Sequence, residues 1–291
     1  MTLQEMNERL AKFVTEHPNN GIQASYALDP GLVGMRFFEA PLLGCASAED
    51  AIFTQFQTDP VIIGPMFRLP EQWLPGAKSV ISFFLPFTKE IRDSNVDHLE
   101  APSYAWLHGR VEGQDFLMEV CDQIVQWLKE EGYESIVPAG HPDFRTNRDP
   151  NRIALGQPMF TSTWSERHVA FAAGLGTFSL TKHLITQKGV CGRFGSIITT
   201  APLTPTPRPY TDPYEYCTFC GACTRRCPVD ALHVDTGKDM VACTALAEQH
   251  RETFFPRHGC GKCQLNLPCT TRIPKKNMKR TCGSNLPQVR F

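Results

Sequence analysis

The sequence predicts a mixed α/β domain followed by a smaller, cysteine-rich domain. Strand-like and helix-like patterns alternate through roughly the first 200 residues, which is typical of an α/β layered domain. Five prolines at 201–213 predict a stiff linker, and nine of the twelve cysteines come after it. We therefore expect an α/β domain at 1–205, a cysteine-rich domain at 206–275 and a basic tail at 276–291.

The first half of the α/β domain contains a capped helix and a buried strand. A Thr-x-x-Glu capping box at 2–5 precedes apolar residues at helical spacing, so we expect a helix to about His17. The run Ser79–Leu85 is short and continuously apolar, which predicts a strand buried on both faces. Residues 22–28 also resemble a strand, and residues 48–56 are compatible with a helix.

The second half continues the alternation of helices and strands. Apolar residues at helical spacing from Phe116 to Leu128 predict a long amphipathic helix that ends near Gly132, and 135–138 is expected to be the next strand. A second Thr-x-x-Glu capping box at 163–166 predicts a helix that continues to Ala173. Residues 194–200 complete the alternation as a strand.

Eight C-terminal cysteines follow the spacing of bacterial ferredoxins. The first run is Cys-x2-Cys-x2-Cys-x3-Cys-Pro at 217–228, in which three cysteines hold one cubane cluster and the fourth reaches a second. Zinc sites prefer paired Cys-x2-Cys units, and disulfides are rare in reducing compartments, so we favour iron–sulfur over both. Residues 206–275 are therefore predicted to be a ferredoxin-like domain with two [4Fe–4S] clusters. We assign one cluster to Cys217, Cys220, Cys223 and Cys269, and the other to Cys227, Cys243, Cys260 and Cys263.

Composition argues against several classes of partner. The net charge is −1, so no overall field attracts nucleic acid or an anionic membrane, and neither is an expected partner. The N-terminus has no basic, apolar leader, and no apolar run approaches the roughly 20 residues that span a bilayer. We therefore expect a cytoplasmic protein. Cys45, Cys121, Cys191 and Cys282 are expected to be packing residues, with Cys191 the one to watch.

Three segments, in order, resemble a known group of enzymes. Residues 73–81, and Ser-Glu-Arg-His at 165–168 leading into Ala-Ala-Gly-Leu-Gly at 172–176, resemble epoxyqueuosine reductases. Reductive dehalogenases carry a similar second segment, and the eight-cysteine pattern resembles both families. The resemblance covers roughly 69–274. It implies a nitroreductase-like, corrinoid-binding α/β domain beside the two clusters, with cobalamin as the group that performs the reduction.

The resemblance implies a reductase that acts on a small molecule or a modified nucleoside, and we expect it in the cytoplasm for the reasons given above. A protein such as ferredoxin or flavodoxin would supply electrons to this reductase. Two alternatives stay open, which are an electron-transfer protein that reduces the corrinoid of a partner protein and a flavin-dependent reductase that holds FMN. The helical-repeat tail with which many epoxyqueuosine reductases bind tRNA is missing from this sequence.

The position of the expected proton donor departs from the family pattern. Epoxyqueuosine reductases have an Asp-Tyr-His segment shortly after Arg-Tyr-Ala, and its aspartate is thought to donate the proton. Here Ser-Tyr-Ala at 103–105 is followed by Trp-Leu-His-Gly-Arg, with no aspartate. His108 and Tyr104 are therefore our candidate catalytic residues, because both side chains can donate a proton. The alternatives are a capping histidine and a core tyrosine.

A second group of residues is expected to contact the cofactor. Its members come from the segment that resembles both families and from the residues just after it. They are Glu166, Arg167, His168, Gly174, Gly176 and Lys182. Glu166 could instead be only the third residue of the capping box, and Lys182 could be a solvated loop residue.

Overall fold

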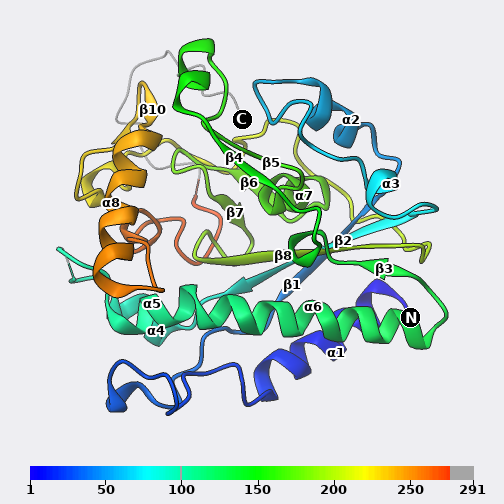
Figure 1. The fold of residues 1–291 in the computed structure, drawn as a ribbon, viewed down its shortest axis with the longest axis horizontal. Coiled ribbons are helices and arrows are strands. Elements are labelled where there is room, and N and C mark those ends of the chain that lie inside the picture. Colours follow the sequence, from blue (N-terminus) through cyan, green and yellow to red (C-terminus); the bar gives the residue numbers. More distant parts are fainter. Residues whose placement is uncertain (99, 276–291) are drawn as a thin grey trace.

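The computed structural model describes residues 1–98 and 100–275, and it places one antiparallel sheet between two layers of helices (Figure 1). Its strands are β1 (Leu42–Ser47), β2 (Ser79–Pro86), β8 (Gly192–Thr199) and β3 (Ser135–Ile136), in the order β1-β2-β8-β3. All three neighbouring pairs are antiparallel. The mixed α/β class is confirmed, whereas the finer nitroreductase-like description stays a prediction.

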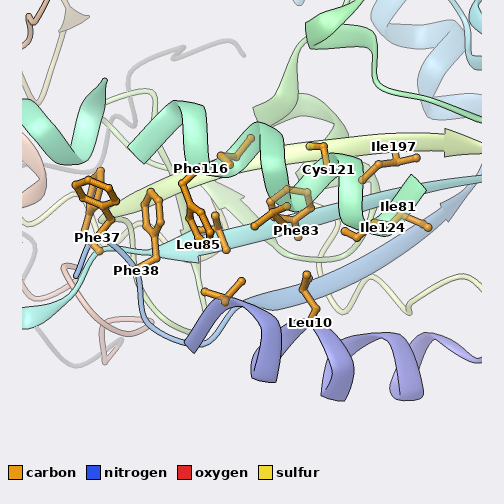
Figure 2. Close-up of a cluster of buried hydrophobic side chains, with 14 of the residues drawn as sticks. Leu10, Phe37, Phe38, Ile81, Phe83, Leu85, Phe116, Cys121, Ile124 and Ile197 are labelled. Atoms are coloured by element: carbon orange, nitrogen blue, oxygen red, sulfur yellow. The ribbon is translucent and has the colours of Figure 1, made fainter. Parts of the chain in front are cut away.

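Strand β2 is buried along its whole length, as its apolar run predicted. Ile81, Phe83 and Leu85 belong to the core beneath the sheet, where α1 (Leu3–Glu16) and α6 (Glu112–Glu130) cover it. Figure 2 shows the side chains of these two helices facing the same side of the strands. Alternate residues of β2 point to opposite faces, so Val80 joins a second core above the sheet.

The second core is rich in aromatic rings. It is covered by α2 (Ala51–Thr58), α3 (Pro70–Trp73) and α7 (Glu166–Ala172). Trp164 stacks on Phe67 with ring centroids 5.3 Å apart, and its indole N–H donates to the Ser196 hydroxyl at 2.8 Å. This bond satisfies a buried polar atom of the strand and fixes the start of α7 above β8.

The two predicted capping boxes have different outcomes. The Thr2 box is confirmed, because the backbone N–H of Glu5 donates to Thr2 Oγ1 and the Glu5 carboxylate accepts from the Thr2 N–H. The second prediction is wrong, since α7 begins after Ser165. The Thr163 hydroxyl instead accepts from the backbone N–H of Arg145 at 3.0 Å. This oxygen is therefore bonded to the segment at 145 and does not cap α7.

The predicted strand at 22–28 is also wrong. This segment forms turns, with the Tyr26 N–H donating to the Gln23 carbonyl. The backbone of Ile22 forms hydrogen bonds with Gly34 and Met35. Strand-like pairing of this segment therefore stops after one residue. The other strands and helices exist with shifted ends, and the helix predicted at 116–128 is α6, which is longer at its N-terminus.

Further helices and two-stranded hairpins surround this sheet. They include α4 (Lys89–Ser94), α5 (Tyr104–Arg110) and α8 (Met240–Phe254), and the hairpins β4 (Thr146–Arg148) with β5 (Phe160–Ser162), β6 (Gly176–Phe178) with β7 (Leu184–Thr186), and β9 (Leu232–His233) with β10 (Gly237–Lys238). Short 3-10 helices lie at η1 (Pro30–Leu32), η2 (Pro138–Gly140), η3 (Pro150–Leu155), η4 (Thr224–Arg226) and η5 (Lys262–Gln264).

The proline-rich linker lies on the α/β domain. Thr206 exchanges two hydrogen bonds with the backbone of Cys45 in β1, at 2.8 and 3.0 Å. The Tyr210 hydroxyl donates to the Phe171 carbonyl and accepts from the Gly176 N–H. The linker thus returns the chain along the sheet and delivers the cysteines to the side of α5. Across the described residues, no helix is long and apolar enough to cross a membrane.

Candidate iron–sulfur and ligand-binding site

Two glycines dock the loop that carries Cys260 against α5. A Cβ atom on Gly261 would lie 2.0 Å from the Trp106 indole, and one on Gly259 would lie 2.4 Å from Arg110 Nε. Both glycines have positive φ angles, of 74° and 106°, which side chains disfavour. Arg110 also donates through Nε to the His258 carbonyl at 3.0 Å. The loop therefore fits against α5 only with glycine at these positions.

A buried lysine between two of the cysteines fixes the same loop. Lys262 Nζ donates to the carbonyl oxygen and the side-chain oxygen of Asn95, both at 2.8 Å, and to the Ala101 carbonyl at 3.3 Å. Asn95 in turn donates to the Cys260 carbonyl at 3.0 Å. Burial lowers the pKa of Lys262 to about 8, so it is still largely protonated at neutral pH and places a cation beside the thiols.

Replacing Gly261 with alanine is expected to lower the thermal midpoint and the iron content, because the new methyl group collides with Trp106. Gly76 provides a matched control, since its φ is also positive, at 80°, and a methyl group added there would have no atom within 4 Å. Both variants bear the cost of a positive φ, and only Gly261→Ala adds overpacking of about 1–3 kcal/mol. Differential scanning calorimetry should show a midpoint lower by roughly 2–4 °C per kcal/mol. Equal midpoints would rule out the tight docking.

The four cysteines of the first predicted group meet around one small cavity. Cys217, Cys220, Cys223 and Cys269 all line it. Burial, together with the nearby thiols of Cys217 and Cys220, raises the pKa of Cys269 to about 12. Such thiols resist ionisation on their own, whereas bound iron favours the thiolate form. The chemistry of this donor set fits an iron–sulfur cluster.

The second predicted group lies on three separate parts of the segment, with Cys260 and Cys263 on one loop. Burial raises the pKa of the Cys263 thiol to about 11, and Cys260, Cys243 and Cys227 act on it as neighbours. Cys243 is in the first turn of α8, and Cys227 Sγ accepts from the Ala231 N–H at 3.1 Å. Among the described residues, no three His, Cys, Asp or Glu side chains are arranged to hold a single metal ion. The division of the thiols between clusters stays a prediction.

A cavity of about 360 Å³ lies between α5, α6, α7, β8 and the turn after Cys263. Its polar lining residues are Arg110, Gln114, Glu166, Arg167, His183, Arg193, Ser196 and Gln264. Burial lowers the pKa of the Arg110 guanidinium, and the nearby side chains of Cys260, Cys263 and Cys243 oppose this shift. All three belong to the second cysteine group. This group therefore borders the cavity through Arg110.

Glu166 is a carboxyl group without a hydrogen-bond partner in the described part of the chain. Both of its carboxyl oxygens are shielded from solvent. Burial raises the pKa of Glu166 to about 7, and the nearby Ser196 hydroxyl opposes the shift without reaching either oxygen in hydrogen-bond geometry. An acid with this pKa holds its proton for part of the time at neutral pH, which suits a proton donor.

Three guanidinium groups from different elements line the same cavity. Arg193 of β8 donates through Nε to Gln114 at 2.8 Å, and Arg167 of α7 donates to the Lys182 carbonyl at 2.5 Å. Arg110 reaches it from the end of α5. None of the three forms an ion pair with any described residue. Burial, with Arg110 as a second cause, lowers the pKa of Arg193 to about 9.

The two predicted catalytic residues do not line this cavity. His108 is fully buried, and its Nε2 accepts from the Leu28 N–H at 3.0 Å, while Nδ1 lies 3.1 Å from Glu112. Both ring nitrogens are therefore engaged, Nε2 with the turn at 22–28 and Nδ1 with α6, as those of a structural histidine would be. Tyr104 is 45% exposed and packs against Phe254 of α8. A catalytic role for either residue gains no support from its position.

The predicted cofactor-binding residues divide into two sets. Glu166 and Arg167 line the cavity, whereas His168 contacts the rings of Phe56 and Phe178 in the core. The backbone of Gly174 approaches the linker, and Gly176 allows close pairing of β6 with β7. Lys182 donates to the Tyr214 hydroxyl at 3.0 Å. These contacts are structural, and none of the last four residues lines the cavity.

Sequence reasoning missed the two arginines that complete the cavity. Arg193 opens an otherwise apolar strand, between two glycines in Gly-Arg-Phe-Gly at 192–195. A charged residue at this place was the available signal. Arg110 ends a buried helix and had no signal beyond its charge, because its role depends on the distant loop that packs against it. Cys191 is buried in the apolar core, in agreement with a packing role.

Comparisons with known proteins agree with the cysteine motif. Residues 211–233 match the family model described as a 4Fe-4S binding domain, which contains the first run of cysteines. The iron–sulfur prediction is therefore confirmed for this segment, while the number of clusters stays a prediction. A search of curated proteins found no significant match.

Solved structures give distant likenesses to the two families that the sequence resembles. Epoxyqueuosine reductase from Bacillus subtilis is 18% identical with a TM-score of 0.47, over 94% of this chain and 68% of that one. An epoxyqueuosine reductase solved with a tRNA stem loop has the same identity and TM-score, over 92% and 66%. A reductive dehalogenase associated with B12-dependent dehalogenation is 14% identical with a TM-score of 0.47, over 90% and 35%.

The chain thus spans about two thirds of the two reductases and about a third of the dehalogenase. At these identities, function must be argued from the residues of this chain.

Proposed function

We propose that this chain is an iron–sulfur reductase that reduces an acceptor held in the arginine-lined cavity. The observation that carries the proposal is the position of Arg110, which lines the cavity and also packs against the loop that carries Cys260, donating to the His258 carbonyl at 3.0 Å. A redox centre held by the second cysteine group would border the acceptor. When bound, the two [4Fe–4S] clusters would supply electrons one at a time.

The residues of the chain would divide the work between them. Cys217, Cys220, Cys223 and Cys269 would hold one cluster, and Cys227, Cys243, Cys260 and Cys263 the other. Lys262 and Arg110 place positive charge beside the second group, and net charge of this kind favours a reduced cluster. Glu166 would hold the proton that accompanies reduction, in place of the two residues proposed from the sequence.

Cobalamin, which the family resemblance implies, fits this cavity only in part. The cavity volume of about 360 Å³ is near the lower end of the range of about 300–1,000 Å³ for small-molecule sites. A whole corrinoid with its nucleotide tail is larger than the usual occupants of such sites, so its ring would have to extend beyond the cavity. Cobalamin therefore stays a prediction, and no step of the proposal depends on it. FMN is the smaller alternative.

Anaerobic reconstitution would test the proposal. Protein loaded with iron and sulfide should be mixed with cobalamin or FMN, desalted, and examined by absorption spectroscopy. Retention of either group, followed by its reduction when a ferredoxin or flavodoxin donor is added, would support a reductase. If clusters form and neither group is retained or reduced, the alternative of electron transfer to the corrinoid of a partner protein would replace it.

A further inference from the structure

The cavity contains an unusual concentration of positive charge. Arg110, Arg167 and Arg193 come from α5, α7 and β8, and all three guanidinium groups line it. No described carboxylate pairs with any of them. Glu166 is the acidic residue of the lining, and with a pKa of about 7 it neutralises at most part of this charge.

Thiolates of the second cysteine group would offset part of the charge of Arg110, but no described group does so for Arg167 or Arg193, and their charge is costly without a counter-ion. Like charges in a partly buried site repel each other and lose hydration. The effect is visible at Arg193, whose pKa is lowered first by burial and then by Arg110. The hydrogen bonds of these arginines are made to neutral oxygens, those of His258, Lys182 and Gln114. Each guanidinium has five N–H donors, so further donors are available for an anion.

We infer that the cavity binds the phosphate group of a small ligand through Arg110, Arg167 and Arg193. The inference rests on the proposed function and deepens it by naming the chemistry of the acceptor. Guanidinium forks bind phosphate oxygens in pairs, and a phosphate offers more acceptor oxygens than a carboxylate does, with a charge of about −2 in a monoester and −1 in a diester. The phosphate could belong to a flavin nucleotide, to the nucleotide tail of a corrinoid or to a phosphorylated substrate.

Calorimetric titration of cluster-loaded protein with inorganic phosphate, in a buffer without other multivalent anions, would test the inference. The wild-type protein should bind phosphate, and Arg193→Gln should weaken binding at least about tenfold, which corresponds to about 1.4 kcal/mol. Arg145→Gln is the matched control, because Arg145 lies outside the cavity and its side chain bonds to the carbonyls of Pro142 and Phe144. It should bind phosphate as the wild type does.

Paired ligands distinguish the sources of the phosphate. FMN binding more tightly than riboflavin would indicate a flavin nucleotide, and cobalamin binding more tightly than cobinamide would indicate a corrinoid tail. If neither pair differs while inorganic phosphate binds, the phosphate belongs to a substrate. No binding of phosphate by the wild type, or equal binding by Arg193→Gln, would overturn the inference.

A second variant and measurements of iron content and electron uptake distinguish failure of the phosphate site from failure of the reductase proposal. If Arg193→Gln fails to fold, Arg167→Gln replaces it, because Arg167 is solvent-accessible and its side chain bonds to a single backbone carbonyl, that of Lys182. Iron content and electron uptake are measured on the same samples. Protein that binds phosphate but passes no electrons would contradict the reductase proposal and leave the phosphate site standing.

Discussion

Replacing Glu166 with glutamine is expected to slow reduction by at least about a hundredfold, because general acids contribute about 10²–10⁴-fold to such steps. The carboxyl is buried without a hydrogen-bond partner among the described residues, and its pKa is raised to about 7. Wild-type activity should therefore fall as pH rises through about 7, since the protonated form is lost there. Glu166→Gln should show low activity with no such inflection.

The same substitution has an effect on stability that needs no substrate. The pKa of Glu166 in the folded protein lies above its ordinary value of 4.5, so the folded state binds the proton more tightly than the unfolded state. The wild-type protein should therefore lose stability as pH rises from about 4.5 to 7, by up to about 3 kcal/mol. Glu166→Gln should lack this loss and be more stable than the wild type at pH 8.

Infrared titration provides a direct measurement, because the protonated carboxyl has its own C=O band. The band should disappear near pH 7 in the wild type and be absent in Glu166→Gln. Glu49→Gln is the matched control, since Glu49 is exposed and pairs only with Lys78. A wild-type band that is already lost near pH 4.5, or full activity in Glu166→Gln, would remove Glu166 as the acid.

Replacing a single cluster cysteine with alanine should remove one of the two predicted clusters and so halve the iron content of the protein. Cys217→Ala and Cys243→Ala are each expected to lower the iron content from about eight to about four atoms per chain. The two variants should lose different clusters, because Cys217 lines the first cysteine cavity and Cys243 lies beside Arg110. Electron paramagnetic resonance of reduced samples should show one remaining cluster signal in each variant, and the two signals should differ.

The predicted assignment places Cys223 and Cys227 on different clusters although they are close in sequence, and substitutions at these two positions test it. Cys223→Ala should resemble Cys217→Ala, and Cys227→Ala should resemble Cys243→Ala, although only three residues separate positions 223 and 227. Cys45→Ala is the control, because Cys45 is buried beside the linker and outside both groups. If Cys227→Ala and Cys223→Ala lose the same cluster, the crossed assignment is wrong.

The features that the sequence could predict are those encoded by local periodicity or spacing. The buried strand β2, the capped helix α1 and the first cysteine run all depend on residues a few positions apart. The capping box at 163–166 failed because Arg145, which is distant in sequence, bonds the Thr163 hydroxyl. Local patterns do not show such competition.

The ligand site was only half predictable for the same reason. Glu166 and Arg167 belong to a recognisable segment, but their shared cavity also needs Arg110 and Arg193 from other parts of the chain. His108 was chosen for its chemistry and its place in the sequence. Its bonds to Leu28 and Glu112 depend on a turn that had been interpreted as a strand. Local sequence patterns show neither bond, and the catalytic role of His108 stays a prediction.

The docking of Gly259 against Arg110 has a thermodynamic consequence. The guanidinium that lines the cavity is held by the loop that carries Cys260, through the carbonyl of His258. A loop that rearranges when iron is lost would move one wall of the ligand site. Occupancy of the second cluster and affinity for the ligand would then be linked, and the linkage is reciprocal. Bound ligand would help to retain the cluster by the same factor by which the cluster improves binding of the ligand.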